Sequence, residues 1–227
     1  MLYDEAAVRA NIRNREGRRV FFLRKEDRLT PGARDYLTAQ RIQILPAEQA
    51  KIEKYRLLGG GYVEEKPEHM THLYGDVLVA KNHPRIRFRG AVDSLEAALM
   101  NCQQIACPKE VGEILTLARH LIRCDVMNES VGEQTLCGLT EEQIRQQSHF
   151  PQDHFGIPHF MPEYTDGPEI LALNSCRCAV RNAELWAVEA YTDSEGSVTR
   201  PDIIRALNRM SSMLYILMLR QKARSES

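Results

Sequence analysis

The chain has 227 residues, of which 43% are hydrophobic, and this is enough to build one well-packed domain with a small appendage. Its formal net charge is −1 at pH 7, so the sequence provides no global basic field for nucleic acid or an anionic membrane surface. We therefore exclude these two classes of partner and expect a small-molecule partner.

The N-terminal segment predicts a small βαβ module. A strand pattern, VFFL, is followed by Thr30 as a helix N-cap, Pro31 at the first helical position, the helix PGARDYLTAQR and a second strand, IQIL. The turn between strand and helix lacks the glycine-rich pattern of nucleotide-binding units, so we do not expect this module to bind a nucleotide.

A change in composition follows the module. Residues 46–66 are charged and contain Gly59, Gly60 and Gly61, a pattern typical of a linker or a flexible turn. We therefore divide the chain into residues 1–58, the βαβ module and linker, and residues 59–227, a second domain.

Helical patterns dominate the second domain. They cover residues 91–106, 108–127, 139–148, 168–192 and 200–222. The predicted fold class is mainly α: an up-and-down helical bundle of four to five helices, preceded by the N-terminal βαβ module. The connection 149–167 is predicted to be irregular, but it is rich in aromatic residues, so we expect it to be ordered and functional.

The cysteines and the termini indicate a cellular compartment. All six cysteines lie in or next to segments with helical patterns, and the N-terminus has no leader of the secretory kind. The longest apolar stretch, MLYILML, is far shorter than the roughly 20 residues that a membrane-spanning helix needs. We expect a cytoplasmic protein with reduced thiols and no transmembrane segment.

One charged face stands out in the segment LNSCRCAVRNAELWAVEAY. Arg177, Arg181 and Glu184 are spaced by four and three residues, so a helix places them on one side, within an otherwise apolar run. Guanidinium groups in such a groove or interface need carboxylate or phosphate partners. Two interpretations stay open: a salt-bridge ladder between subunits, or a bound anion.

Three further groups of polar residues are candidates for the same site. Asp93 is predicted to open a helix and to pair with one of the arginines, although a lone aspartate there is most often a cap. Asn208 and Ser212 interrupt an apolar stripe, which usually indicates a buried hydrogen-bond network. A glycine-containing loop before the first bundle helix carries a set that could bind phosphate, although similar sets are common in surface loops: Thr71, His72 and Lys81.

Taken in register, these segments resemble a known family. LVAKNHPRIRFRGAVDSLEA, LALNSCRCAVRNAE and RALNRMSSMLYIL are similar, in the same order, to three signatures of helical-bundle ATP:cob(I)alamin adenosyltransferases. LTPGARDYL, KPEHMTHL and RPDIIRALNR resemble the branch of the family that serves ethanolamine utilisation. The likeness runs from about residue 20 to about residue 220.

The resemblance implies roles for individual residues. Arg181 matches the arginine that binds the ATP triphosphate, and Arg177 the one that pairs with the aspartate at Asp93, often across a subunit boundary of a trimer. Arg181, Asp93 and Arg177 therefore form the expected catalytic set. The implied ATP-binding residues are Thr71, His72, Lys81, Arg181, Glu184 and Asn208.

The implied reaction is attack of Co(I) of a reduced corrinoid on C5′ of ATP, with Mg²⁺ bound mainly through the phosphates. The family excludes the lower axial ligand of cob(II)alamin with an apolar side chain, and Phe160 is the candidate here. The alternative is that Phe160 anchors the loop to the core. The implied cobalamin-binding residues are Phe160, Met161, Phe155 and Asp93.

The sequence departs from the family pattern at the phosphate loop, at Ser212 and at a metal site. THLYGD replaces the fuller phosphate loop of the bundle family, and Ser212 stands where many relatives have aspartate. A histidine and Cys-Cys-x-x-Cys site of some ethanolamine-branch enzymes is missing before THL, so we expect no protein-bound transition metal there. Cys176 and Cys178 point in different directions on a helix and cannot share a metal. His149, His154 and His159 could converge on a metal if their loop curls, but the favoured interpretation is that they line a corrinoid cleft or pack within the loop.

The resemblance also implies partners. We expect ATP and cob(II/I)alamin as substrates, a reductant or reductase, a homotrimer with active sites between subunits, and possible association with a bacterial microcompartment. Two other functions stay open from the sequence. One is a non-catalytic corrinoid-binding or delivery protein on the same bundle, and the other is an unrelated helical scaffold whose arginine face is an oligomer interface.

Overall fold

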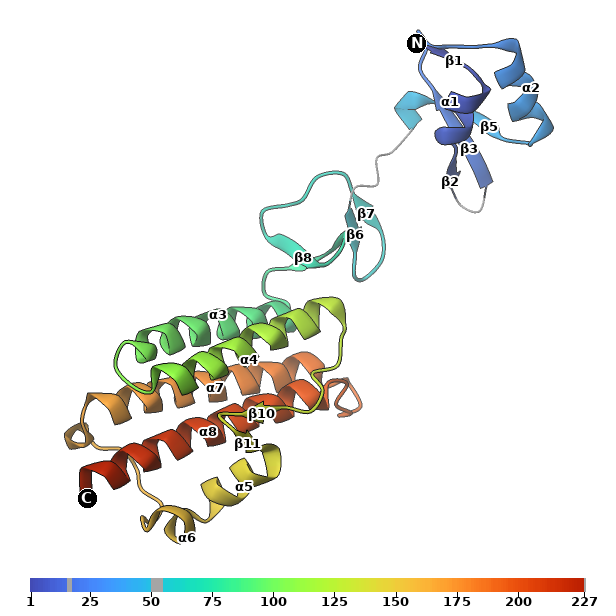
Figure 1. Cartoon of the computed structure of the whole chain (residues 1–227). Helices are drawn as coiled ribbons and strands as arrows, with labels where there is room; N and C mark the ends of the chain where they lie inside the picture. The colour runs from blue at the N-terminus through green and yellow to red at the C-terminus, as the bar shows by residue number, and fades with distance from the viewer. Residues whose placement is uncertain (16–17, 50–54, 227) are drawn as a thin grey trace. The chain divides into compact units, whose positions relative to one another are not determined.

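The structure is a computed structural model that describes residues 1–15, 18–49 and 55–226. The chain forms two compact units, Met1–Lys66 and Pro67–Ser227 (Figure 1). Part of the linker expected over 46–66, residues 50–54, lies outside the described residues. The division after residue 58 remains a proposal, because a compact unit is not by itself an independently folding domain.

The N-terminal unit contains the predicted βαβ arrangement. Strand β3 (Arg18–Leu23) pairs in parallel with β5 (Gln43–Pro46), and α2 (Pro31–Ala39) connects them. The Thr30 hydroxyl accepts a hydrogen bond from the Ala33 N–H at 3.3 Å, which caps α2 as predicted. The remaining elements are β1 (Leu2–Tyr3), α1 (Glu5–Ala10), β2 (Arg13–Arg15), β4 (Arg28–Leu29) and η1 (Ala47–Gln49).

Two short hairpins follow in sequence. Strands β6 (Tyr55–Leu57) and β7 (Tyr62–Val63) pair antiparallel around the three glycines, and Gly60 and Gly61 adopt φ values of 97° and 85° that suit glycine. Strands β8 (Met70–Tyr74) and β9 (Val77–Ala80) form the second hairpin. The expected loop over residues 71–81 is therefore largely a hairpin, and its Leu73, Val77 and Val79 pack against Ile86.

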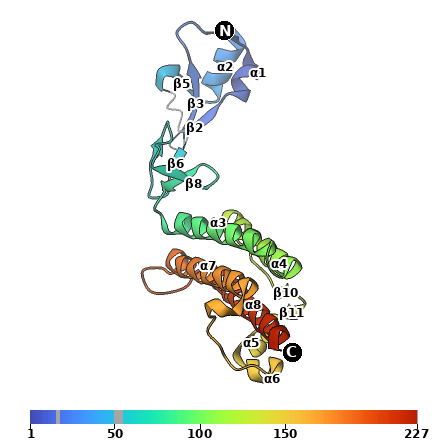
Figure 2. The ribbon, with the colours of Figure 1, turned by 90° about the vertical axis from the view of Figure 1, so that its left-hand side faces the viewer.

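The second unit is a helical bundle, which confirms the mainly α fold class. Its four long helices lie side by side in both ribbon views (Figures 1 and 2). They are α3 (Pro84–Gln103), α4 (Pro108–Met127), α7 (Pro168–Tyr191) and α8 (Pro201–Glu226). Between α4 and α7 the chain forms β10 (Thr135–Leu136), β11 (Leu139–Thr140), α5 (Glu141–His149), α6 (Pro151–Phe155) and η2 (Tyr164–Asp166). The expected irregular connection 149–167 thus contains a helix and a 3₁₀ turn.

The first bundle helix starts earlier than predicted, at Pro84 instead of residue 91. The His83 imidazole accepts a hydrogen bond from the Arg85 N–H at 3.2 Å, so it acts as the N-cap. Burial and the neighbouring Arg85 and Arg89 lower the pKa of His83, which favours the neutral ring that this cap requires. As a result, Asp93 lies in the middle of α3, and the prediction that it occupies a first helical turn is wrong.

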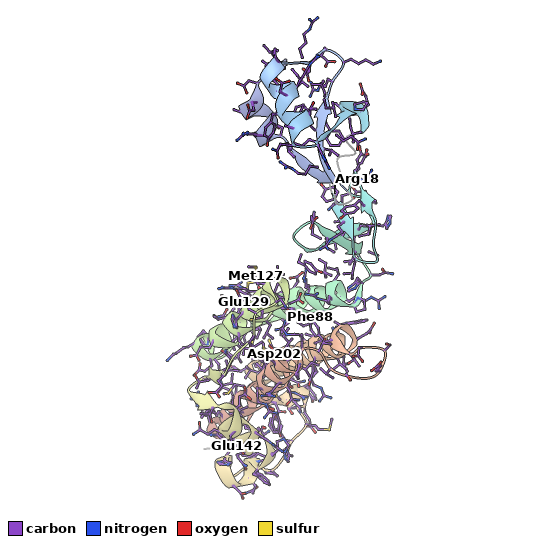
Figure 3. The ribbon with its side chains drawn as sticks, turned by 90° about the vertical axis from the view of Figure 1, so that its right-hand side faces the viewer. Arg18, Phe88, Met127, Glu129, Glu142 and Asp202 are labelled. Atoms are coloured by element: carbon purple, nitrogen blue, oxygen red, sulfur yellow. The ribbon has the colours of Figure 1, made fainter. Side chains whose placement is uncertain are left out.

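Apolar side chains from all four long helices form one core. Phe88, at the start of α3, is completely buried between the helices (Figure 3). Each fully buried leucine or phenylalanine side chain contributes roughly 1.5–3 kcal/mol of transfer free energy. Cys176 belongs to this core and Cys178 is exposed, so the two thiols point apart as predicted. Among the described residues, no helix is both long and apolar enough to cross a membrane.

Candidate functional site

The predicted charged face lies on α7, beside α8. The Arg177 guanidinium donates from Nε and NH2 to the Asn174 Oδ1 atom at 3.2 and 3.1 Å. Arg181 is exposed and makes no hydrogen bond or ion pair with any residue that the structure describes. Arg177 is therefore held in place by Asn174, whereas Arg181, one turn later, is not held by any described residue.

The last residue of the face connects the two helices. The Asn208 Nδ2 atom of α8 donates to the Glu184 Oε1 atom of α7 at 3.2 Å, and Arg209 donates to the Asn208 Oδ1 atom. The prediction of a buried network is wrong for Asn208, because its side chain is exposed. The Nε atom of Arg209 is buried without a hydrogen-bond partner among the described residues.

A pocket of about 430 Å³ opens beside this seam. It brings together six residues that the sequence singled out: His149, His159, Phe160, Met161, Arg177 and Ser212. The complete lining is Ser148, His149, His159, Phe160, Met161, Arg177, Ser211, Ser212 and Tyr215. Such a mixture of aromatic, thioether, hydroxyl and cationic groups suits a ligand that is partly apolar and carries polar substituents.

Phe160 is held by α8. Its backbone N–H donates to the Tyr215 hydroxyl at 3.2 Å, and the two rings stack with centroids 6.0 Å apart. Lys222 lies with Nζ 5.7 Å from the centroid of the Phe160 ring, and also forms an ion pair with Asp166 at 2.6 Å. Phe160 therefore lines the pocket and packs against the core, so both interpretations of this residue describe part of its environment.

The other expected cobalamin-binding residues differ in position. Met161 is 88% exposed at the pocket. Phe155, at the end of α6, packs against the bundle core and is not among the residues that line this pocket. Asp93 is exposed on α3 and has no hydrogen bond or ion pair in the described part of the chain, so it does not pair with Arg177 within one subunit.

The expected phosphate-binding residues lie on and after the second hairpin. Thr71 is in β8, and Lys81 is exposed in the turn between β9 and α3. The His72 Nδ1 atom lies 3.0 Å from the Gly75 carbonyl oxygen, so this imidazole closes the turn of the hairpin. Among the described residues of one chain, no hydrogen bond or ion pair joins Thr71 or Lys81 to Arg181.

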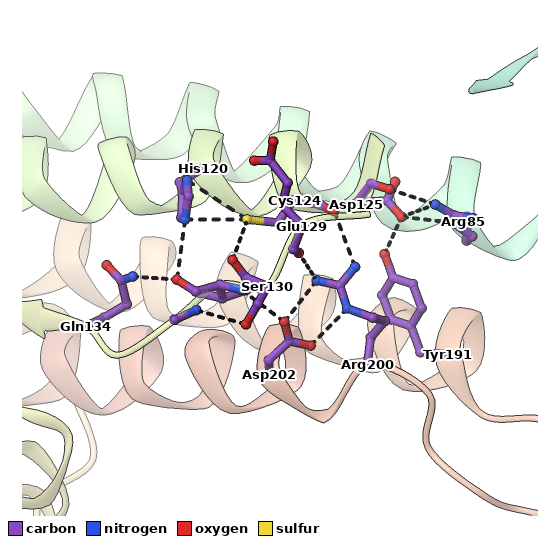
Figure 4. A network of polar contacts seen from close by, with 12 residues as sticks. Arg85, His120, Cys124, Asp125, Glu129, Ser130, Gln134, Tyr191, Arg200 and Asp202 are labelled. Atoms are coloured by element: carbon purple, nitrogen blue, oxygen red, sulfur yellow. Dashed lines mark hydrogen bonds and ion pairs between the residues drawn. The ribbon is translucent and has the colours of Figure 1, made fainter. Parts of the chain in front are cut away.

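A buried polar network of the bundle contacts this hairpin through Arg89, and Figure 4 shows the part of the network around Asp125. Asp125 of α4 is fully buried and accepts hydrogen bonds from Arg85 at 2.8 Å, Arg89 at 2.6 Å and the Tyr191 hydroxyl at 2.7 Å. Arg89 also donates to the Leu73 carbonyl oxygen in β8 at 2.8 Å. Burial, and then the Asp125 carboxylate, raise the pKa of Tyr191, so this phenol stays protonated as a donor.

A second part of the network holds the start of α8. Arg200 forms two hydrogen bonds with the Asp202 carboxylate, both at 2.9 Å, and donates to the Glu129 carbonyl oxygen at 2.8 Å. The Arg200 guanidinium is the main reason that the pKa of Asp202 falls to about 2. Neither part of the network was predicted from the sequence, although the arginines of RIRFRG were a signal of the first part and Arg200 and Asp202 of RPDIIRALNR a signal of the second.

The described histidines and cysteines do not form a metal site. His159 approaches the carbonyl oxygen of His149 at 3.2 Å, and His154 stacks against Phe155. Within residues 1–15, 18–49 and 55–226, no three His, Cys, Asp or Glu side chains are placed to hold a metal ion. The three loop histidines are thus not brought together in this structure.

The arrangement along α7 sets what this site can do. Arg177 lines the pocket, Arg181 follows one turn later, about 6 Å along the helix axis, and Glu184 meets Asn208 at the next turn. A ligand in the pocket would thus lie next to an unpaired guanidinium, a group that binds phosphate oxygens well. The geometry suits two adjacent ligands, one partly apolar and the other anionic.

Comparisons with known proteins point to one family. The description of the family whose profile matches residues 61–221 is cobalamin adenosyltransferase. The chain is 31% identical to the corrinoid adenosyltransferase EutT of Salmonella typhimurium strain LT2, over 95% of this chain and 90% of that protein. It is equally similar, with the same coverage, to the protein of the same name from Escherichia coli strain K12.

Proposed function

We propose a reaction for this chain from one premise: it belongs to the cobalamin adenosyltransferase family. It is a corrinoid adenosyltransferase, which transfers the adenosyl group of ATP to the cobalt of a corrinoid. We further propose that it supplies adenosylcobalamin for ethanolamine catabolism, as the likeness to the ethanolamine branch implies.

In this proposal the pocket beside α8 binds the corrinoid and Arg181 binds the triphosphate of ATP. The observation that carries it is the position of an unpaired, exposed guanidinium one helical turn from a residue that lines the pocket. Glu184 and Asn208 complete the nucleotide side of the site, and Thr71, His72 and Lys81 approach the phosphates from a neighbouring subunit or after a rearrangement.

The chemistry asks for positioning and charge rather than a protein nucleophile. Co(I) donates its electron pair to C5′ of ATP and forms the cobalt–carbon bond. The bond between C5′ and O5′ breaks, and triphosphate leaves with the electron pair of that bond. The site must hold C5′ in line with cobalt, and Arg181 must neutralise the charge that develops on the leaving oxygen.

Mg²⁺ fits the donors available at this site. This ion usually keeps several waters and takes one or two protein carboxylates together with substrate phosphates. Glu184 is the half-buried carboxylate of the charged face, and its Oε1 atom already accepts a hydrogen bond from Asn208. Glu184 would therefore contact the ion or its waters, while the triphosphate supplies the remaining oxygens and the ion adds positive charge.

Phe160 would act on the lower face of the corrinoid. Cob(II)alamin is hard to reduce while a lower axial ligand is attached, and an apolar side chain beneath the ring excludes that ligand. Phe160 lines the pocket and is fixed by contacts from α8, as this role requires. Met161 would extend the apolar surface, and Phe155 would support the loop from the core side.

Assembly is the remaining part of the proposal. We assign Arg177 and Asp93 to an ion pair across the boundary of a homotrimer, which accounts for an exposed aspartate with no partner among the described residues of one chain. A cytoplasmic location, a reductase that delivers the electron, and docking to a bacterial microcompartment through the N-terminal unit are further parts of this proposal.

The direct test is a spectroscopic assay. The protein is mixed with ATP, Mg²⁺ and cobalamin under a strong reductant, and the absorbance of light-sensitive adenosylcobalamin is followed. We expect conversion that depends on ATP and releases triphosphate. Binding of the corrinoid without conversion would instead indicate a carrier, and no binding at all would remove the corrinoid from the proposal.

A further inference from the structure

We propose that Tyr215 is a positioning residue, whose hydroxyl group sets the backbone at Phe160 and thereby holds the Phe160 ring beneath the corrinoid. The inference rests on the proposed function, since it concerns how the lower axial ligand is excluded. Tyr215 lies in α8 and lines the same pocket as Phe160, so its hydroxyl acts at the site itself.

The hydroxyl joins three segments of the bundle. It accepts a hydrogen bond from the Phe160 N–H at 3.2 Å and lies 3.2 Å from the His159 Nδ1 atom. The other nitrogen of that imidazole, Nε2, lies 3.2 Å from the carbonyl oxygen of His149, the last residue of α5. One phenol on α8 therefore connects the pocket loop to the end of α5.

Donors and acceptors in this chain of contacts match in only one way when the imidazole is neutral. A carbonyl oxygen can only accept, so His159 donates from Nε2 to His149, and its Nδ1 atom is left as an acceptor. The Tyr215 O–H then donates to His159 Nδ1 and accepts from the Phe160 N–H. Every polar group of the set has a partner, which fixes the directions of its members.

The rings make the same arrangement stiff. The His159 ring stacks on the Tyr215 ring with centroids 5.9 Å apart and an angle of 11° between the planes. The Phe160 ring stacks on the same phenol with centroids 6.0 Å apart. Tyr215 thus holds two consecutive loop residues by its ring as well as its hydroxyl, and a phenylalanine in its place would keep the stacking and lose only the hydrogen bonds.

A second residue of α8, Lys222, holds the same loop at a later position. Lys222 lies seven residues after Tyr215, two helical turns on the same side of α8. It pairs with Asp166 in η2 at 2.6 Å and lies over the Phe160 ring. Because this contact remains when the Tyr215 hydroxyl is removed, the loop should stay on the bundle while the direction of the Phe160 ring becomes less restricted.

The test compares two oxidation states of the substrate in the variant Tyr215→Phe. Cob(II)alamin needs its lower ligand excluded before reduction, whereas cob(I)alamin prepared chemically carries no such ligand. With cob(II)alamin and a reductant, we expect turnover to fall about tenfold, because the site loses one or two hydrogen bonds. With cob(I)alamin, turnover should fall only about twofold. The KM for ATP should change by less than about twofold.

The spectrum of bound cob(II)alamin gives a readout that a general loss of stability would not move. With ATP present, Tyr215→Phe should increase the fraction of cob(II)alamin that retains its lower ligand. His159→Phe, which keeps a ring for stacking but removes the acceptor of the hydroxyl, should move the same fraction in the same direction. The double variant should be no worse than Tyr215→Phe alone, because both changes act through one hydroxyl.

Tyr164→Phe is the matched control, because it removes a hydroxyl from a side chain that is 88% exposed in the same connection. It should leave both rates and the spectrum unchanged. Equal losses with cob(II)alamin and cob(I)alamin in Tyr215→Phe, or an unchanged spectrum, would overturn the positioning role. If the unmodified protein fails to adenosylate even cob(I)alamin, the proposed function fails instead, so the two failures are distinguishable.

Discussion

At the scale of single residues, three arginines have structural partners within the chain, whereas Arg181 has none among the described residues. Arg85 and Arg89 are mostly buried and share the carboxylate of Asp125, while Arg200 is occupied by Asp202 and backbone carbonyl oxygens. Arg181 is exposed and has no partner among the described residues. A guanidinium without an internal partner is available to a phosphate, and this supports the role proposed for it.

Arg181→Ala should therefore reduce catalysis without reducing stability. We expect turnover to fall by about 100-fold or more, a loss of about 3 kcal/mol of transition-state stabilisation, as for other single preorganised donors. Arg181→Lys should recover only part of it, because an ammonium group lacks the planar fork of donors.

The control for this prediction is Arg119→Ala, which removes a cation from an exposed position on α4. Both variants should unfold within about 0.5 kcal/mol of the original chain, as surface substitutions usually do. A loss of rate in Arg119→Ala as large as that in Arg181→Ala would show that net charge, and not this particular guanidinium, is responsible.

Asp202 should make stability depend on pH in acid. Its pKa is about 2, below the ordinary 3.8, so folding favours the charged form and Asp202 contributes its stabilisation above about pH 4. That contribution is lost as the pH falls from about 4 towards 2, when the carboxylate is protonated and releases Arg200. Asp202→Asn removes it at every pH.

The measurement is urea unfolding of both proteins at several pH values between 7 and 2. The difference between their free energies of unfolding should be constant down to about pH 4 and shrink below it. A difference that stays the same down to pH 2 would show that the charge on Asp202 does not stabilise the start of α8.

At the scale of elements, local signals predicted the helices well and the hairpins poorly. Helix α4 begins at Pro108 and ends at Met127 as predicted, since a proline in the first turn and the end of the apolar period define both limits. The hairpin of β8 and β9 was not predicted. Val77, Leu78 and Val79 of β9 are all buried, so this strand shows no alternation of apolar and polar residues.

Part of the candidate site was predictable because local spacing within one segment indicated it. Arg177 and Phe160 were found through spacing and family resemblance, and the structure brings both to one pocket. Asp125 and Tyr215 were missed because their importance lies in contacts over long sequence separations, 66 residues from Asp125 to Tyr191 and 55 from Tyr215 to Phe160. Periodicity within one segment carries no information on such partners.

The contact between α3 and β8 suggests an element-scale prediction. Arg89→Ala removes the donor to the Leu73 carbonyl oxygen and one of the partners of Asp125. Amide hydrogens of β8 and β9 should exchange faster, because the hairpin loses a charged contact with the bundle. If Thr71 and Lys81 bind phosphate as proposed, the KM for ATP should rise as well.

The comparison variant is Arg87→Ala, two residues before Arg89 in α3. Arg87 is more exposed, and its contacts with the described residues are a long ion pair with Glu189 at 3.8 Å and a contact with the Trp186 ring. Its loss should leave exchange in the hairpin unchanged. Unaltered exchange in Arg89→Ala would show that apolar packing of the hairpin against Ile86 holds it without the arginine.

At the scale of the whole molecule, exposed apolar residues indicate where the proposed trimer forms. Leu185 is 71% exposed and Val188 is 41% exposed, and they follow Arg181 at intervals of four and three residues on α7. Such residues lie on one side of a helix. An apolar strip next to an unpaired arginine is what an interface with a substrate at its edge would present.

Leu185→Glu should therefore shift the protein from trimer to monomer in sedimentation experiments, because it places a charge in the interface, and activity should fall with the loss of trimer. Met127→Glu is the control, since Met127 is 62% exposed on α4 (Figure 3) and lies outside the strip. A stable trimer of Leu185→Glu would place the contact on another face.

The contacts of Tyr215 and Lys222 in α8 with the loop that carries Phe160 also determine the order in which parts of the protein can fold during synthesis. Tyr215 and Lys222 are synthesised some fifty residues after the loop that they hold. The N-terminal unit and the first bundle helices can fold during translation, but the pocket cannot be complete before α8 has left the ribosome. A nascent or prematurely terminated chain should therefore be unable to bind the corrinoid tightly, which keeps a costly, reactive molecule away from unfinished protein.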